Sequence, residues 1–280
     1  MRNLVNDDNV VKKRRGLDRL EKFFPPHRST KIEPVSAKGF KAEWIKTPRS
    51  RDSRVVLYIH GGGFVLYPKL YRDMISRIAT ASQSIVLSLD YSLSPEHKYP
   101  TALYEALAAY SWLLKDYQAK DIALAGDSAG GALVLSLIHL IHKKKLPNPA
   151  CAVVLSPATD ATLSGKTLTS NKKKDFFLST EALDYFVGAY FGDQPRDNPI
   201  ASPLFGTFEN FPPLLVHTDK SEVMYDDSAR LINKAKQAGV KVESYETDNL
   251  WHVYHIYARY VPDAKKAIDH IGRFIQNNFT

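Results

Sequence analysis

A serine flanked by glycines is the strongest chemical signal in the sequence. It is Ser128, in the stretch GDSAG at residues 126–130, directly after the apolar run of residues 122–125 and directly before a helical pattern. This order is the G-x-S-x-G pattern in its strand–turn–helix context, in which a tight turn lifts the serine hydroxyl clear of a sheet. The pattern predicts that Ser128 is the nucleophile of an acyl transfer.

A serine hydroxyl is a weak nucleophile until a neighbouring base takes its proton. In enzymes with this turn, the acid and then the histidine of the triad follow the serine along the chain. Four histidines follow at sufficient distance: His217, His252, His255 and His270. The first lies within a predicted strand and the last within a predicted terminal helix, and His255 is expected to enter the next helix. His252 follows the last predicted strand in a loop, so it is the predicted base.

The second chemical signal is the stretch HGGG at residues 60–63, which follows the apolar run of residues 55–59. Glycine loses more backbone entropy on ordering than any other residue, so three in succession need a reason. Attack on an ester carbonyl creates an oxyanion, which preorganised hydrogen-bond donors stabilise. Glycine amides can approach it without interference from side chains. We therefore predict an oxyanion hole formed by the amides of Gly62, Gly63 and Ala129.

Two kinds of segment alternate from residue 54 onward and must position these groups. Runs of strand type occupy residues 55–59, 85–89, 122–125, 152–155, 214–217 and 242–246. Helical patterns occupy residues 70–81, 102–117, 130–144, 221–238 and 262–277. Apolar strands separated by helices predict an α/β protein with a mostly parallel sheet that is covered on both faces. Residues 39–46 alternate between apolar and polar side chains, which predicts an antiparallel edge strand.

Three stretches, HGGGF, DYSLSPEHKYPTAL and GDSAGG, occur in this order, and WHVYH follows near the end of the chain. Together they resemble the hormone-sensitive-lipase-like branch of the α/β-hydrolases, and the resemblance extends over nearly everything beyond residue 50. It implies an α/β-hydrolase fold, hydrolysis of carboxylic esters that often carry short acyl chains, and the oxyanion hole described above. The sequence departs from the family at Ser92, where an arginine is usual, which affects a supporting interaction rather than the chemistry.

The resemblance also implies a helical lid built from two parts of the chain. Residues 1–45 would supply its N-terminal part, and residues 161–210 would form the lid insertion. The catalytic domain would then consist of residues 46–160 and 211–280. An interval as long as 161–210 between two strands of a sheet is more typical of a lid or a binding element than of a bare loop.

Four carboxylates follow the fifth strand of the parallel series and could complete the triad: Asp219, Glu222, Asp226 and Asp227. Family members carry an aspartate or, in a subset, a glutamate at the position aligned with Glu222, so the resemblance implies that Glu222 is the acid. The alternative is that Asp219 to Glu222 form a capping box, in which the glutamate reaches back to an amide at a helix start. In that case Asp219 or Asp226 would be the acid.

Composition and charge exclude several classes of protein. The 280 residues, 44% hydrophobic and 24% charged, are typical of a globular chain with one large domain. The net charge of +8 comes with short lysine runs but without a nucleic-acid-binding motif, so no nucleic-acid partner is expected. The N-terminal stretch lacks the apolar core of a secretory signal, and the apolar helix at residues 132–142 is too short to cross a bilayer. Cys151 is expected to be buried in the core, and one cysteine fits the reducing cytoplasm.

The sequence therefore predicts a serine carboxylesterase that hydrolyses short-chain esters of small molecules without a metal or other cofactor. A homodimer is compatible with this prediction. One alternative is another acyl hydrolase, acting on amides, lactones, acetylated xylan or xenobiotics. A second is a ligand receptor of the same fold that has lost hydrolysis. Such receptors typically lack the histidine, so the presence of His252 favours an enzyme.

Overall fold

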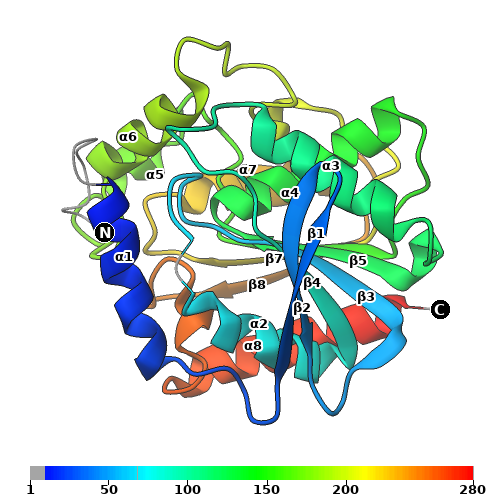
Figure 1. Cartoon of the computed structure of the whole chain (residues 1–280). Helices are drawn as coiled ribbons and strands as arrows, with labels where there is room; N and C mark the ends of the chain where they lie inside the picture. Colours follow the sequence, from blue (N-terminus) through cyan, green and yellow to red (C-terminus); the bar gives the residue numbers. More distant parts are fainter. Residues whose placement is uncertain (1–9, 68, 280) are drawn as a thin grey trace.

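The computed structural model describes residues 10–67 and 69–279, so residues 1–9 of the predicted N-terminal lid lie outside the described residues. Within the described ranges, a sheet of eight strands crosses the molecule in the order β1-β2-β4-β3-β5-β6-β7-β8 (Figure 1). The strands are β1 (Lys31–Ala37), β2 (Phe40–Lys46), β3 (Arg51–Ile59), β4 (Ser84–Leu89), β5 (Ile122–Asp127), β6 (Cys151–Leu155), β7 (Leu214–Asp219) and β8 (Val242–Thr247). Strands β3 to β8 pair in parallel, which confirms the predicted α/β-hydrolase fold.

The start of the sheet differs from the prediction in one respect. β2 is antiparallel to β4, as expected for residues 39–46, but it is not the edge strand, because β1 pairs with its outer side. β1 has no buried residue and contains Pro34, which an edge strand tolerates because one side of its backbone is unpaired. It therefore lacks the apolar run by which a strand is recognised. The division into lid and catalytic domain stays a prediction, although β1 and most of β2 lie within residues 1–45.

Helices cover both faces of the sheet (Figure 1). α3 (Thr101–Leu113), α4 (Ala129–Lys143) and α7 (Tyr225–Gln237) lie on one face, and α2 (Tyr71–Ser82) and α8 (Pro262–Asn278) lie on the other. Successive residues of β3 alternate between the two cores: Val55, Leu57 and Ile59 belong to the first, and Val56 and Tyr58 to the second. All five side chains are fully buried, so β3 has an apolar run instead of an alternating pattern.

A third, smaller cluster of buried side chains joins the N-terminal helix to the insertion after β6. α6 (Thr180–Phe191) begins after Ser179, whose hydroxyl accepts a hydrogen bond from the Ala182 amide at 3.2 Å. Ala182 and Phe186 pack in this cluster with Val10 of α1 (Val10–Asp18). Figure 1 shows α1 and α6 beside each other on one flank of the sheet. The short elements of the insertion are α5 (Thr167–Ser170) and the 3-10 helix η4 (Pro203–Phe205).

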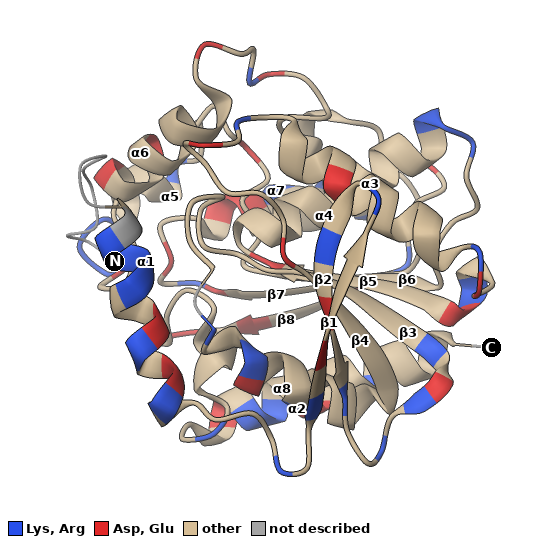
Figure 2. Ribbon diagram, viewed as in Figure 1, with Lys and Arg blue, Asp and Glu red and all other residues tan. Residues whose placement is uncertain are grey.

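Lys and Arg residues are spread over helices and connecting loops and are mixed with Asp and Glu (Figure 2). The remaining short 3-10 helices are η2 (Arg19–Phe23), η3 (Ala119–Asp121) and η5 (Tyr254–Tyr257). Within the described residues, no helix is long and apolar enough to cross a membrane. Cys151 lies fully buried in β6, as expected, and burial raises the pKa of its thiol.

Candidate active site

Ser128 occupies a strained turn between β5 and α4. Its backbone has φ 51° and ψ −122°, a conformation that non-glycine residues rarely adopt. The amide of Ser128 donates to the Leu155 carbonyl at 2.8 Å, and its own carbonyl accepts from the amides of Ala132 and Ala158 at 3.1 Å. These three backbone hydrogen bonds fix the turn, so the surrounding structure holds Ser128 in its strained conformation. The strand–turn–helix context inferred from the sequence is therefore present.

The glycines on both sides of the serine allow the chain to pack closely against β3. A Cβ atom on Gly130 would lie 2.0 Å from the Ile59 carbonyl oxygen, and one on Gly126 would lie 2.7 Å from the same atom. Real Cβ atoms do not approach backbone oxygens so closely. The first turn of α4 can therefore lie against the end of β3 only if these two positions lack side chains.

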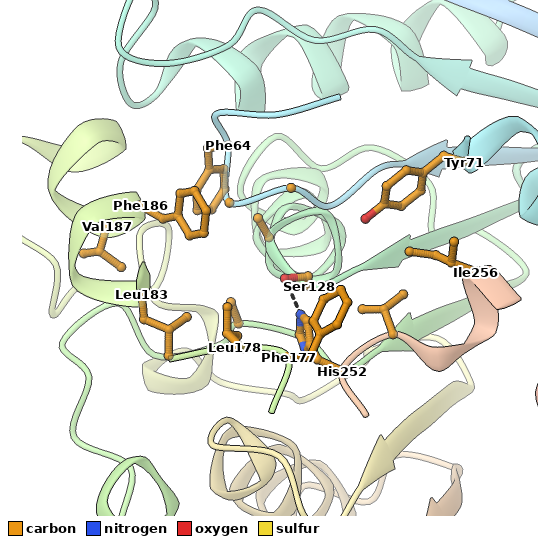
Figure 3. Close-up of a pocket in the computed structure, with 15 residues that line it drawn as sticks. Phe64, Tyr71, Ser128, Phe177, Leu178, Leu183, Phe186, Val187, His252 and Ile256 are labelled. Atoms are coloured by element: carbon orange, nitrogen blue, oxygen red, sulfur yellow. Dashed lines mark hydrogen bonds between the residues drawn. The ribbon is translucent and has the colours of Figure 1, made fainter. Parts of the chain in front are cut away.

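His252 links Ser128 to Glu222 through two hydrogen bonds. The Ser128 hydroxyl lies 2.9 Å from His252 Nε2, and His252 Nδ1 lies 2.7 Å from Glu222 Oε2. Figure 3 shows the imidazole facing the serine hydroxyl. His252 is 3% exposed and Glu222 is 1% exposed, so the bond between them is shielded from water, while the bond to Ser128 is partly buried. The carboxylate accepts from Nδ1–H, which leaves Nε2 free to accept the serine proton.

The second oxygen of Glu222 reaches back to an amide, as the alternative interpretation expected. Glu222 Oε1 accepts from the Asp219 amide at 2.8 Å and from the Ser156 hydroxyl at 2.7 Å. No helix begins at this point, because residues 221–224 form turns and α7 starts at Tyr225 instead of at residue 221. The same carboxylate therefore both faces His252 and braces its own turn.

The other three candidate acids bond elsewhere. Asp219 Oδ2 accepts from the Leu250 amide at 3.0 Å, Asp226 Oδ2 accepts from the Lys166 amide at 2.9 Å, and Asp227 Oδ2 accepts from the Thr159 amide at 2.7 Å. Of the four carboxylates, Glu222 alone has a hydrogen bond to His252 in the described structure. Asp219 nevertheless supports the site, because it ties the turn before Glu222 to the loop that leads to His252.

The glycine loop lies at the carboxyl end of β3 beside the serine. Gly62 has φ +93° and Gly63 has φ +63°, which favour glycine. The amides of Gly62, Gly63 and Ala129 donate no hydrogen bond within the described residues. All three residues line one cavity together with Ser128 and His252. Unpaired amides beside a nucleophile are the arrangement that an oxyanion hole needs.

A buried carboxylate that was not singled out from the sequence holds this loop. Asp127 accepts hydrogen bonds from the Gly61 amide at 3.0 Å, the Tyr58 hydroxyl at 2.8 Å and the Tyr71 hydroxyl at 3.0 Å. Burial raises the pKa of Asp127 to about 6, although the three hydrogen bonds oppose the shift. Its only sequence signal was an acidic residue at the end of an apolar strand. Such a residue must find donors, but the sequence does not say which ones.

Ser92 forms its hydrogen bonds with a carboxylate of α3. Its hydroxyl and its amide each donate to Glu105, with both distances 2.6 Å. The hydroxyl thus holds the loop after β4 to α3.

The remaining late histidines are kept away from the serine. His217 Nδ1 lies 3.0 Å from His255 Nε2, and His217 Nε2 lies 3.1 Å from His270 Nδ1. This chain of rings connects β7, η5 and α8, and none of its three members has a hydrogen bond to Ser128 in the described structure. Among the described residues, no group of three or more His, Cys, Asp or Glu is placed to hold a metal ion.

Burial and charge act in opposite directions on the catalytic candidate His252. Burial lowers its pKa, but the hydrogen bond and charge of Glu222, with the charges of Asp175 and Asp127, outweigh burial and raise the pKa above the ordinary value of 6.5. Glu222 thus favours the imidazolium, the state that forms when a serine proton is taken up.

The cavity beside Ser128 is small and mostly apolar. It has a volume of about 40 Å³ and shares the lining residues Phe64, Ala158, Leu183 and Val187 with a neighbouring cavity of about 30 Å³. The large apolar side chains that line it are Phe64, Phe177, Leu178, Leu183, Phe186, Val187, Val253 and Ile256. Figure 3 shows Leu183, Phe186 and Val187 on the α6 side of this space. The insertion after β6 therefore supplies much of the wall.

The chain is similar to known proteins over most of its length. Residues 56–256 match a family model described as the alpha/beta hydrolase fold. The chain is 35% identical over 262 residues to an esterase from Acinetobacter venetianus, an alignment that covers 92% of this chain and 86% of that protein. It is 33% identical over 275 residues to an acetyl-hydrolase from Streptomyces hygroscopicus, covering 97% and 91%. A solved esterase from the bacterial hormone-sensitive lipase family superposes with a TM-score of 0.95 and 35% identity, covering 100% of this chain and 95% of that one.

Proposed function

Because this chain belongs to the hormone-sensitive-lipase-like esterase family of the α/β-hydrolase fold, we propose that it hydrolyses its substrates through an acyl-enzyme on Ser128. It is a carboxylic ester hydrolase, and the proposal concerns its residues and its substrates. The observation that carries the proposal is the unbroken pair of hydrogen bonds from Ser128 through His252 to Glu222. Hydrolysis of p-nitrophenyl esters by the wild type and by Ser128→Ala tests it.

Acylation begins when the Ser128 hydroxyl oxygen attacks the ester carbonyl while His252 Nε2 takes the hydroxyl proton. The negative charge on the carbonyl oxygen is stabilised by the amides of Gly62, Gly63 and Ala129, which need no reorganisation at that moment. The positive charge on the imidazole is stabilised by Glu222. Collapse of the intermediate expels the alcohol, which receives the proton from His252 and leaves the acyl group on Ser128.

Deacylation repeats the sequence with water as the nucleophile. His252 takes a proton from water, whose oxygen attacks the acyl carbonyl, and the same amides stabilise the second oxyanion. The bond to the Ser128 oxygen then breaks, and the proton on His252 returns to the serine. The products are the alcohol and the carboxylic acid, and no cofactor is consumed.

We expect esters with acyl chains of roughly two to six carbons to be the best substrates, because the cavity beside Ser128 is only about 40 Å³. An ester of twelve carbons should have a kcat/KM at least about tenfold lower. A p-nitrophenyl ester series of increasing chain length measures this. An optimum at twelve carbons or more, with activation at an oil–water interface, would contradict it.

The wall between the two cavities provides a matched pair of variants for the same measurement. Leu183→Ala should join the two cavities and move the optimum to longer esters. Leu178→Ala removes the same atoms from the first cavity but does not open the second, so it is the control. Identical optima for the two variants would show that the second cavity does not receive the acyl chain.

Activity should rise with pH through an inflection above 6.5. His252 must be neutral to accept the serine proton, and Glu222 raises the pKa of His252 above the ordinary value of 6.5. At pH 6.5, a larger fraction of His252 is therefore protonated, and the enzyme inactive, than an unperturbed imidazole would give. The profile of kcat/KM from pH 5 to 9 at constant ionic strength measures this. A flat profile would count against a histidine base.

The Streptomyces relative is named an acetyl-hydrolase, which favours acetyl esters among the proposed short-chain substrates. Amides, lactones, acetylated xylan and xenobiotic esters remain alternative substrates for the same residues. A receptor without hydrolysis is not supported, because the chain is a carboxylic ester hydrolase. We also propose a cytoplasmic location, which the unpaired, buried Cys151 supports.

A further inference from the structure

A second pocket, separate from the cavity at Ser128, is lined by three arginines. Arg28, Arg77 and Arg259 come from the loop after η2, from α2 and from the segment after η5. With Pro25, Pro26, His27 and Tyr260 they line a hollow of about 580 Å³ that is open to solvent. This arginine pocket shares no lining residue with the cavity beside Ser128. The proposed mechanism therefore does not explain it.

Arg77 is held so that most of its donors are unused. Its Nε donates to both oxygens of Asp73, at 3.1 and 3.0 Å, and Asp73 is fully buried. The Arg77 side chain is 18% exposed. Its two terminal nitrogens donate no hydrogen bond within the described residues. A guanidinium fixed through Nε presents its terminal N–H groups in a rigid plane, the geometry that suits oxygen anions.

The walls that carry the other two arginines are also anchored. The guanidinium of Arg259 lies over the ring of Tyr260, 6.0 Å from its centroid, and the Tyr260 hydroxyl donates to the Phe23 carbonyl. The amide of His27 donates to the Ser76 hydroxyl at 2.8 Å, which fixes the loop before Arg28 to α2. The pocket is thus built on three tethered segments instead of on a free loop.

The charges in the pocket do not balance. Within the described residues, neither Arg28 nor Arg259 forms an ion pair, so Asp73 is the one carboxylate that offsets the three guanidinium groups. Two positive charges remain uncompensated. The pKa of His27 is lowered by burial and then by the charges of Arg77, Arg28 and Arg259, while Asp73 opposes them. All three arginines therefore lie close enough to His27 to act on its ring, and a ligand with two negative charges would offset the two remaining positive charges.

We propose that the arginine pocket binds a phosphate dianion, either free inorganic phosphate or the phosphate monoester headgroup of phosphatidic acid. The three arginines line one solvent-open volume, and the terminal nitrogens of Arg77, which donate no hydrogen bond within the described residues, are left to donate to phosphate oxygens. The site is distinct from the ester-hydrolysis residues, so the test of this proposal does not depend on the proposed mechanism.

Titration of the full chain with inorganic phosphate by calorimetry tests this, with chloride at the same ionic strength as the reference. We expect saturable binding to the wild type. The double variant Arg28→Gln/Arg259→Gln should weaken it at least tenfold, without leaving the buried Asp73 unpaired. The double variant Lys265→Gln/Arg273→Gln removes the same charge from exposed positions of α8 outside the pocket, and its affinity should stay within twofold.

Vesicles distinguish the two sources of phosphate. If the wild type binds vesicles that contain phosphatidic acid but not free phosphate, and only the Arg28→Gln/Arg259→Gln variant loses that binding, the pocket binds a lipid headgroup. Vesicles of phosphatidylcholine alone, which carry no net charge, are the reference. Equal losses in both double variants would identify general surface charge and overturn the proposal. Absence of binding to both phosphate and anionic vesicles would overturn it as well.

Discussion

Ser128→Ala is expected to lower kcat for ester hydrolysis by a factor on the order of 10⁶, the loss seen when the nucleophile of a serine triad is removed. The hydroxyl is the group that forms the acyl-enzyme, and alanine offers no replacement. The turn should persist, because its hydrogen bonds to Leu155, Ala132 and Ala158 are made by the backbone of residue 128. Initial rates with p-nitrophenyl butyrate measure the loss, and a thermal melt should show little change in Tm.

A fluorophosphonate probe separates loss of the nucleophile from loss of the fold. It should label the wild type once and Ser128→Ala not at all. Ser136→Ala is the matched control, because Ser136 is a buried serine of α4, two turns further along and outside the cavity at Ser128. This variant should keep both activity and labelling. Labelling that persists in Ser128→Ala would assign the nucleophile to another residue.

Three of the strands that surround the site, β3, β5 and β7, were predictable because their apolar runs are buried on both faces of the sheet. The apolar runs at residues 55–59 and 122–125 correspond to the buried parts of β3 and β5. Parallel pairing then brings the carboxyl ends of β3, β5, β7 and β8 to one edge of the sheet. The predicted functional residues follow those ends, so their mutual proximity is a consequence of the topology.

Contacts made by side chains from distant segments were not predictable in the same way. The bond from Asp127 to Gly61 depends on how closely the end of β5 approaches the loop after β3. The bond from Asp219 to Leu250 depends on the relative position of two loops. Neither leaves a periodic pattern in the sequence. The choice among the candidate acids had the same difficulty, because four carboxylates within nine residues are equivalent until their directions are known.

Glu222→Gln should lower kcat by roughly 10⁴, the loss seen when a triad carboxylate is replaced by its amide. Glu222 faces two sets of donors, His252 Nδ1–H on one side and the Asp219 amide with the Ser156 hydroxyl on the other. Glutamine has one oxygen and one NH₂ group, so it cannot accept on both sides. If its NH₂ faces His252, the imidazole must carry its proton on Nε2 and cannot accept one from Ser128.

The pH profile of the residual activity distinguishes this role from simple bracing of the turn. Glu222 is the largest influence raising the pKa of His252, against the effect of burial. Its replacement should therefore move the acid inflection of kcat/KM to lower pH, which loss of a turn contact would not do.

Asp226→Asn is the matched control, because Asp226 contacts the Lys166 amide and not His252, and it should retain most activity. Asp219→Asn should fall between the two, since Asp219 positions both loops without touching the imidazole. An inactive Asp226→Asn beside an active Glu222→Gln would place the acid one helical turn further along the chain.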